Sequence, residues 1–188
     1  MSEVLTEVDD GILIVTINRP EAKNAMNKAA AEGISAAMDR LEAENDLRVA
    51  ILTGAGGTFC AGADLKGVSD GRGNRVDEQG DGPMGPSRML LSKPTIAAVE
   101  GFAVAGGLEL AVWCDLRVAA RDAVFGVYCR RWGVPLVDGG TVRLPRLIGH
   151  GRALDMILTG RGVGGEEALA FCLANRLVEG GRALEEAK

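Results

Sequence analysis

Hydrophobic and polar positions alternate along the first part of the chain in two different periods. Two apolar runs, Val4 to Val8 and Ile12 to Ile17, are separated by Asp-Asp-Gly, which is typical of a turn between paired strands. From Lys28 to Glu44 the apolar residues recur at helical spacing, with charges on the opposite face. The continuous apolar run Arg48 to Gly54 then predicts a strand that is buried on both faces.

The alternation continues in the second half of the chain. Lys93 to Gly101 predicts another strand, and Ala105 to Asp115 predicts a helix that begins at paired glycines. The following stretch, LRVAARDAVFG, predicts one or two short strands. Strands that alternate with helices indicate an α/β fold in which crossover helices cover the sheets.

The C-terminal part predicts helices. GGTVRLPRLIGHGRALDMILTG predicts helices that are broken at Pro145 and Gly149, and GGEEALAFCLANRLVEGG predicts one more helix that ends at its terminal glycines. With 188 residues, we expect one domain over residues 1–188.

Residues 67–89 lack any periodicity. They are rich in Gly, Asp and Arg, which predicts a long mobile loop. Such a loop is either a disordered insertion or, because it follows a candidate site, a lid or a pocket wall.

Composition and charge narrow the function classes. The net charge of −5 and the aromatic content of 4% disfavour nucleic-acid binding. No apolar run is long enough for a membrane span and no signal peptide is visible, so we expect a cytoplasmic protein without a membrane partner. The four cysteines form no CxxC pair and are expected to be reduced thiols; they are Cys60, Cys114, Cys129 and Cys172. With His150 as the single histidine, a histidine-based metal cluster or catalytic triad is strongly disfavoured.

Two glycine-rich turns follow buried strands, in TGAGGTFCAGAD and GFAVAGGLEL. Neither has the lysine of a phosphate loop, and the dinucleotide pattern fails because its third glycine slot is Phe59. Small residues leave backbone N–H groups accessible, and two such groups that converge would form an oxyanion hole. Alternatively, the glycines only allow close packing of strand and helix.

Four segments resemble the successive signatures of the crotonase superfamily, the enoyl-CoA hydratases and isomerases. They are NRPEAKNAMN, ILTGAGGTFCAGADLK, AVEGFAVAGGLELAVWCD and GGTVRLPRLIG, in the family's order and approximate spacing. The resemblance runs from about Val4 to the end of the chain. It implies a crotonase-like α/β fold, a ββα spiral with covering helices, and chemistry on an acyl-CoA thioester.

The resemblance assigns the two carbonyl-binding N–H groups to Ala63 and Gly106. It implies substrate and CoA contacts at Lys23, Ala61, Gly62, Ala63, Asp64, Leu65, Lys66, Gly106 and Trp132. Lys23 and Lys66 are candidate cations for the CoA phosphates, although a single lysine in a turn is commonly only a solvated side chain. Asp64 is expected to cap or brace the following helix.

Glu109 is the candidate catalytic carboxylate. It lies in the first turn of the predicted helix, where a glutamate also stabilises the helix dipole without any chemistry. The resemblance favours catalysis, because this position holds one of two glutamates that handle water and the α-proton in the hydratases.

The chain departs from the hydratases at the second glutamate. Cys129 aligns there, and Asp138 is the nearest replacement acid, one residue out of register with the aspartate of some isomerases. Arg130 and Arg131 are expected to pair with Asp138 or with an acidic substrate group. Trp132 either lines the acyl pocket or is an ordinary buried tryptophan.

The resemblance also bears on assembly and cofactors. Family members usually continue into C-terminal helices that build trimers, and these are expected to be absent or shortened here, since the chain ends at GGRALEEAK. A homo-oligomer, either a trimer or a dimer of trimers, is implied. No cofactor and no metal are expected, because coenzyme A is part of the substrate.

The leading hypothesis is an enzyme of the enoyl-CoA hydratase type that hydrates a 2-enoyl-CoA through a stabilised thioester enolate. One alternative is an isomerase or another crotonase reaction that uses a single glutamate. The other is a CoA-thioester binding protein with little catalysis.

Overall fold

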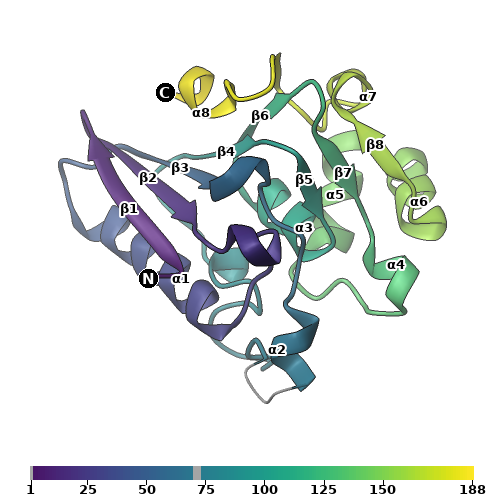
Figure 1. The fold of residues 1–188 in the computed structure, drawn as a ribbon, viewed down its shortest axis with the longest axis horizontal. Helices are drawn as coiled ribbons and strands as arrows, with labels where there is room; N and C mark the ends of the chain where they lie inside the picture. The colour runs from purple at the N-terminus through teal and green to yellow at the C-terminus, as the bar shows by residue number, and fades with distance from the viewer. Residues whose placement is uncertain (1, 70–72) are drawn as a thin grey trace.

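Two β-sheets with helices on their outer faces make up the molecule in the computed structural model, which describes residues 2–69 and 73–188 (Figure 1). The strands are β1 (Val4–Asp9), β2 (Ile12–Ile17), β3 (Val49–Gly54), β4 (Thr95–Val99), β5 (Phe102–Val104), β6 (Leu116–Ala120), β7 (Val124–Gly126), β8 (Gly162–Gly164) and β9 (Arg176–Val178). The helices are α1 (Lys28–Ala43), α2 (Leu65–Ser69), α3 (Gly106–Trp113), α4 (Cys129–Trp132), α5 (Gly140–Ile148), α6 (His150–Thr159), α7 (Gly165–Ala170) and α8 (Ala183–Ala187). Short 3-10 turns are η1 (Pro20–Ala22), η2 (Ala55–Gly57) and η3 (Pro86–Arg88).

The larger sheet has the strand order β1-β2-β3-β4-β6-β9. The predicted hairpin is confirmed, because β1 pairs antiparallel with β2 across the turn at Asp10 and Gly11. All other neighbours in this sheet run parallel. Parallel strands are buried on both faces, which accounts for their continuous apolar sequences.

The smaller sheet has the order β5-β7-β8, with β5 and β7 parallel and β8 antiparallel to β7. Successive strands alternate between the sheets: β4 and β6 belong to the larger one, and β5 and β7 follow them directly in the smaller one. The chain therefore winds from one sheet into the other, turn after turn.

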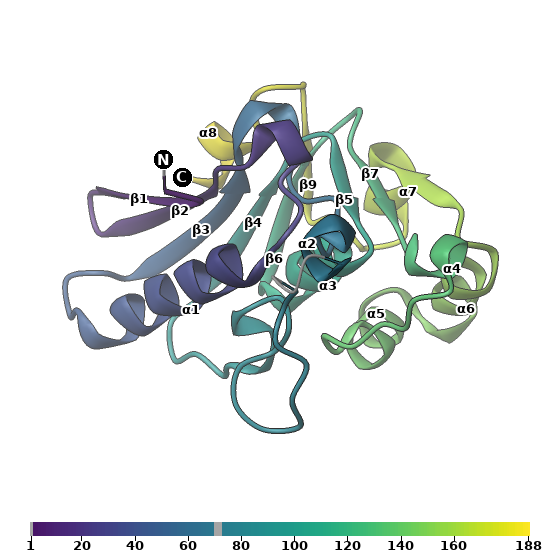
Figure 2. The same ribbon diagram turned by 60° about the horizontal axis from the view of Figure 1, so that its bottom comes forward.

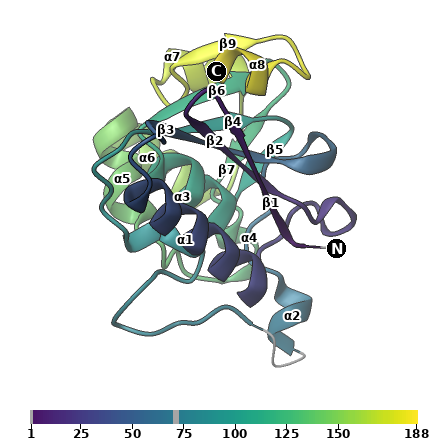
Figure 3. The ribbon, with the colours of Figure 1, turned by 90° about the vertical axis from the view of Figure 1, so that its left-hand side faces the viewer.

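Helices cover the larger sheet on opposite faces. Figures 2 and 3 show α8 on one side of β3 and β4, and α1 on the other. Adjacent residues of β3 face the two sides, with Ile51 in the cluster under α8, and Ala50 and Leu52 in the main core with α1 and α3. The candidate site lies at the α3 side of this arrangement.

The helices α1 and α3 and the strands β6 and β7 agree with the sequence patterns. α1 begins at Lys28, where the Asn27 side chain accepts a hydrogen bond from the Ala30 N–H at 2.9 Å. α3 covers most of the predicted helix, and the two short strands β6 and β7 are both present. The short strand β5 before α3 is an addition that the sequence pattern did not separate from its neighbours.

Two predictions in the C-terminal part are wrong. Pro145 lies inside α5 and does not break it. The missing N–H of Pro145 removes one backbone hydrogen bond, and the burial of Leu144 and Ile148 outweighs that loss. The predicted break at Gly149 is confirmed.

The helix predicted over GGEEALAFCLANRLVEGG is also wrong in its second half. α7 ends at Ala170, and the residues of β9 pair in parallel with Val118–Ala120 of β6. The pairing between strands overrides the local helical pattern here. Within residues 2–69 and 73–188, no helix combines the length and apolarity that crossing a membrane requires.

Candidate active site

A cavity of about 710 Å³ opens beside the start of α3. Its wall comes from Lys23 and from four stretches of the chain, within residues 61–65, 74–84, 102–109 and 128–138. Most of the lining side chains are apolar, and among the described residues the carboxyl groups of Glu109 and Asp138 are the two acidic groups in the wall. A mostly apolar pocket with few convergent polar groups is typical of a small-molecule site.

The two glycine-rich turns meet at this cavity. An added Cβ on Gly62 would lie 3.2 Å from the Gly106 nitrogen, and one on Gly107 would lie 2.1 Å from the Cys60 carbonyl oxygen. The glycines therefore allow a close approach that no larger residue would permit. This contact brings Ala63, the residue after Gly62, next to the N-terminus of α3.

Ala63 and Gly106 both line the cavity. In the part of the chain that the structure describes, neither backbone N–H donates to a protein acceptor. Gly106 is the first residue of α3, where N–H groups have no partner within the helix. Ala105 precedes it with a φ of 54°, a positive value that is uncommon for a residue other than glycine, at the turn from β5 into the helix.

Glu109 extends from the first turn of α3 into the cavity wall and is buried. Its Oε1 accepts hydrogen bonds from the N–H groups of Asp138 at 3.0 Å and Gly140 at 2.8 Å. Burial, together with the charge of Asp138, raises the pKa of Glu109 to about 7 against the lowering effect of the N–H donors. The group is therefore suited to both taking and giving a proton near neutral pH.

Asp138 lines the same cavity and is buried as well. Its Oδ1 accepts hydrogen bonds from the Met84 N–H at 2.9 Å and from the Ser87 hydroxyl. Burial raises the pKa of Asp138, while the bonds from Ser87 and Met84 favour its charged form. The structure thus brings the sequence-predicted pair, Glu109 and Asp138, to one cavity.

Cys129 begins α4 and also lines the cavity. Burial, followed by the nearby charge of Glu109, raises the pKa of its thiol to about 11, so the group is neutral at physiological pH. A neutral thiol does not replace a carboxylate as an acid or base near neutral pH.

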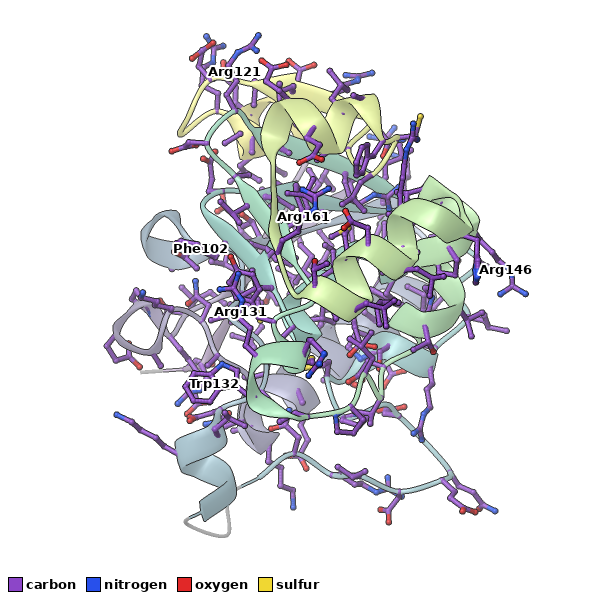
Figure 4. All side chains as sticks on the ribbon, turned by 90° about the vertical axis from the view of Figure 1, so that its right-hand side faces the viewer. Phe102, Arg121, Arg131, Trp132, Arg146 and Arg161 are labelled. Carbon is purple, nitrogen blue, oxygen red and sulfur yellow. The ribbon has the colours of Figure 1, made fainter. Side chains whose placement is uncertain are left out.

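Trp132 at the end of α4 is 72% exposed and borders the cavity, so its interpretation as a buried tryptophan is wrong. Figure 4 shows it on the same side of the molecule as Phe102 and Arg131. The predicted pairing of two arginines with Asp138 is wrong too, since Arg130 donates to the Leu158 carbonyl at 3.2 Å and Arg131 to the Gly160 carbonyl at 2.8 Å.

The predicted CoA-binding residues divide into two sets. Lys23, Ala61, Ala63 and Leu65 line the cavity, whereas Gly62 is buried behind it. The Lys23 ammonium lies 5.7 Å from the centre of the Phe102 ring.

Asp64 and Lys66 lie outside the cavity lining. The structural role of Asp64 is confirmed, because its carboxylate accepts from the Gly67 N–H at 3.1 Å and pairs with Arg19 at 2.9 Å. Lys66 follows on α2 with an exposed side chain.

The segment after α2 contributes residues that the sequence analysis did not single out. Asn74, Val76, Pro83 and Met84 line the cavity, which confirms the pocket-wall interpretation for this part. Residues 70–72 of the same predicted loop lie outside the described residues. The sequence analysis did not single out Ser87, because its partner Asp138 is 51 positions away. The one nearby hint in the sequence is Gly82, which leaves space for the Ser87 hydroxyl.

Metal ligands do not cluster at the site. Within the described ranges, no group of three or more His, Cys, Asp or Glu side chains lies close enough together to hold a metal ion.

Comparisons with known proteins agree with this geometry. Residues 7–187 match the family model described as enoyl-CoA hydratase/isomerase. The chain is 42% identical over 192 residues to enoyl-CoA hydratase EchA19 of Mycobacterium tuberculosis, which covers 98% of this chain and 71% of the relative. It is 37% identical over 193 residues to the short-chain-enoyl-CoA hydratase of Clostridium acetobutylicum, covering 100% of this chain and 73% of the relative.

Solved structures give the same result for the fold. The crystal structure of enoyl-CoA hydratase EchA1 from Mycobacterium marinum superimposes with a TM-score of 0.94 at 48% identity, over 100% of this chain and 73% of the other. The chain therefore spans about three quarters of the length of these similar proteins.

Proposed function

The chain belongs to the enoyl-CoA hydratase/isomerase family, and from this premise we propose that it hydrates a 2-enoyl-CoA at the cavity beside Glu109. Its fold is the crotonase-like α/β fold that the sequence predicts, and its relatives are enzymes. The observation that carries the proposal is Glu109 itself: a buried carboxyl group, fixed by two N–H donors, in the wall of an apolar cavity.

We propose that the N–H groups of Ala63 and Gly106 bind the thioester oxygen. The support is that both residues line the cavity, and that neither N–H has a protein acceptor among the described residues. Negative charge that develops on the oxygen would be stabilised there, and one such donor is typically worth about 2.7–4 kcal/mol.

In the proposed reaction, the oxygen of water forms a bond to the β-carbon while the π electrons move toward the thioester oxygen. Glu109 as carboxylate takes the proton that water loses and, once protonated, donates a proton to the α-carbon, so that one water is added in total. The pKa of Glu109, raised to about 7 by burial, supports this role because both forms are populated at neutral pH.

Asp138 is proposed as the second carboxyl group of the site. Its Oδ1 is occupied by the Met84 N–H and the Ser87 hydroxyl, and the residue lines the same cavity. It therefore supplies the second acidic group that Cys129 does not supply.

The CoA part is proposed to bind along residues 61–66. Lys23 at the cavity rim, and Lys66 on α2, are the cations that we propose for its phosphates. Replacing Lys23 with alanine is expected to raise KM more than it lowers kcat, because a contact remote from the reacting atoms contributes uniform binding.

The direct test is turnover of a panel of 2-enoyl-CoA thioesters by the native protein and by Glu109→Gln. We expect a loss of at least about 10²-fold in kcat, the lower end of what a positioned acid or base contributes. Glu32→Gln, an equal charge change on the exposed face of α1, is the control and should retain full activity. Equal turnover by the native protein and Glu109→Gln would remove Glu109 from the mechanism.

One observation favours a second candidate function. The neutral thiol of Cys129 lies where a second glutamate is expected, which suits a single-glutamate reaction such as double-bond isomerisation. Mass spectrometry separates the two, because hydration adds the mass of one water and isomerisation adds none. Tight acyl-CoA binding without any product would instead indicate a binding protein.

Three further expectations stay proposals. We propose a homo-oligomer, a trimer or a dimer of trimers, and light scattering coupled to size-exclusion chromatography tests it.

We propose that the reaction needs no cofactor or metal, since two N–H donors suffice to polarise the carbonyl. Activity should therefore survive dialysis against a chelator. A cytoplasmic location, suggested by four unpaired cysteines, is testable by cell fractionation.

A further inference from the structure

We propose that Ser87 is a positioning residue that holds Asp138 in orientation toward the substrate, and so couples the cavity wall formed by residues 74–84 to the second carboxyl group. This inference rests on the proposed function, because it assigns a role within the same site. Ser87 does not line the cavity and would act only through Asp138.

The contact between Ser87 and Asp138 is buried. Ser87 is 1% exposed, lies in η3, and donates its hydroxyl hydrogen to Asp138 Oδ1. Arg143 of α5 bridges both backbones, since it donates to the Ser87 carbonyl at 2.7 Å and to the Asp138 carbonyl at 2.8 Å. A bifunctional arginine of this kind fixes the separation of the two chain segments.

Glycines make room for the contact. A Cβ on Gly82 would lie 1.8 Å from the Ser87 hydroxyl oxygen and 3.0 Å from Asp138 Oδ1. Gly85 has a φ of 88°, and its Cβ would lie 2.5 Å from the Ala31 carbonyl of α1. The segment is therefore seated closely between α1 and Asp138.

The same segment reaches the proposed carbonyl-binding N–H group. A Cβ on Gly106 would lie 2.7 Å from the sulfur of Met84, so Met84 packs directly against the start of α3. The N–H of Met84 is the second donor to Asp138 Oδ1. One short stretch thus lines the cavity, packs on Gly106 and holds Asp138.

The bonding leaves Asp138 with one occupied and one available oxygen. Oδ1 accepts the hydrogen bonds of both donors. Oδ2 has no hydrogen-bond partner among the described residues, and it keeps some exposure to solvent. If the Ser87 hydroxyl were lost, Oδ1 would keep only the Met84 N–H as a donor, and the orientation of the carboxyl group would be less restricted. Both the orientation and the acidity of Asp138 would change.

Other charged groups around Asp138 set the background for its titration. Arg88 of η3 and Arg143 of α5 favour its charged form, and the Glu109 carboxyl of α3 and the Cys129 thiol of α4 lie near it. Because Ser87→Ala leaves these four groups in place, a change in titration reports the hydroxyl itself.

The activity test combines Ser87→Ala, Ser87→Thr and Asp138→Asn with a 2-enoyl-CoA substrate. We expect Ser87→Ala to lower kcat by roughly tenfold with little change in KM, a part of the 10²–10⁴-fold that a positioned acid or base supplies. Ser87→Thr, which keeps the hydroxyl, should recover most of the loss. In the Asp138→Asn background, Ser87→Ala should cost little more, since coupled residues are non-additive.

Ser92→Ala is the matched control. The Ser92 hydroxyl donates to the Glu42 carboxylate at 2.8 Å, an equivalent contact on the surface away from the cavity. Its removal should leave kcat and its pH dependence unchanged. An equal loss of kcat from Ser87→Ala in the native and Asp138→Asn backgrounds would overturn the proposal, because it would show an effect that does not pass through Asp138.

A second measurement does not depend on activity. Carboxyl-carbon NMR of protein labelled at aspartate follows the titration of Asp138 directly, with Asp138→Asn used to assign the signal. Loss of a donor to the charged form should move the titration of Asp138 to higher pH in Ser87→Ala. An unchanged titration would overturn the proposal even if no thioester is hydrated, whereas lack of turnover by the native protein alone would count against the proposed function and not against this contact.

Discussion

At the residue scale, the position of the Glu109 carboxyl group depends on Gly140, which has no side chain. An added Cβ on Gly140 would lie 2.9 Å from both Glu109 Cγ and Oε1, so this residue leaves room for the carboxyl group and also donates an N–H to it. The glycine is the first residue of α5, not a left-handed position, so alanine fits the backbone.

We predict that Gly140→Ala displaces the Glu109 carboxyl group and lowers kcat/KM by about 10²-fold, the cost of a misplacement of about 1 Å. The folded structure should persist. Gly151→Ala is the control, because a Cβ on Gly151 of α6 meets nothing within 4 Å. Steady-state kinetics and thermal unfolding of both variants check this, and unchanged activity in Gly140→Ala would contradict the clash.

The raised pKa of Glu109 also predicts a pH dependence of stability. The pKa rises from 4.5 to about 7 on folding, so between these values the folded state binds a proton that the unfolded state has released. The contribution of Glu109 to stability is present below pH 4.5 and is lost as the pH rises through about 7.

Glu109→Gln removes this dependence. The free energy of unfolding of the variant minus that of the native protein should therefore be larger at pH 8 than at pH 5. The increase should be about 1.4 kcal/mol for each unit of pKa shift. Urea unfolding of both proteins at both pH values measures the difference. A constant difference across this range would show that the carboxyl group is not perturbed by folding.

Arg117 joins three elements at the scale of helices and strands. It is 1% exposed and donates from its guanidinium to the carbonyls of Leu173 at 2.6 Å and Cys114 at 2.7 Å, and to the Asn175 side chain at 3.1 Å. These contacts connect the end of α3, the strand β6 and the turn before β9.

We predict that Arg117→Met lowers the free energy of unfolding by about 3 kcal/mol or more, since each buried acceptor left without a donor costs about 1–3 kcal/mol. Arg176→Met, which removes an exposed ion pair with Glu186, should cost less than about 1 kcal/mol. Urea unfolding measures both, and similar values for the two variants would contradict the role of Arg117.

Sequence patterns predicted elements well where local periodicity and burial agree. α1 is such a case, because it buries the face that its helical period defines, and the hairpin of β1 and β2 is another, because the turn signal lies between two apolar runs that pair directly. β9 was assigned to a helix because its three residues, Arg176–Val178, carry too little pattern to reveal their pairing with β6. The interior Pro145 shows the same limit in α5, where burial of the helix face outweighs one lost backbone bond.

The cavity joins distant parts of the chain at the scale of the whole molecule, so ligand binding should stabilise the complete fold. A saturated acyl-CoA, which has no double bond to hydrate, should contribute about 2.7 kcal/mol at a concentration of 100 Kd. For a chain of this size that corresponds to a rise in Tm of roughly 5–10 °C.

Differential scanning calorimetry tests this, with free CoA as the control. At equal concentrations of the two ligands, the acyl-CoA is expected to raise Tm more than CoA alone, because the cavity is lined mostly by apolar side chains. Equal shifts for the two ligands would indicate that the acyl chain lies outside this cavity.

The choice of Glu109 as the catalytic carboxylate came from the resemblance to the crotonase superfamily, whereas local patterns in the sequence determined the hairpin, α1 and the two turns of small residues. Each of these is encoded by neighbours within one turn or strand. Only the tertiary structure decided how the carboxyl groups are held, since Gly140 lies 31 positions from Glu109, and Ser87 lies 51 positions from Asp138. Such pairs depend on where the crossing segments pack, and no local period records that packing.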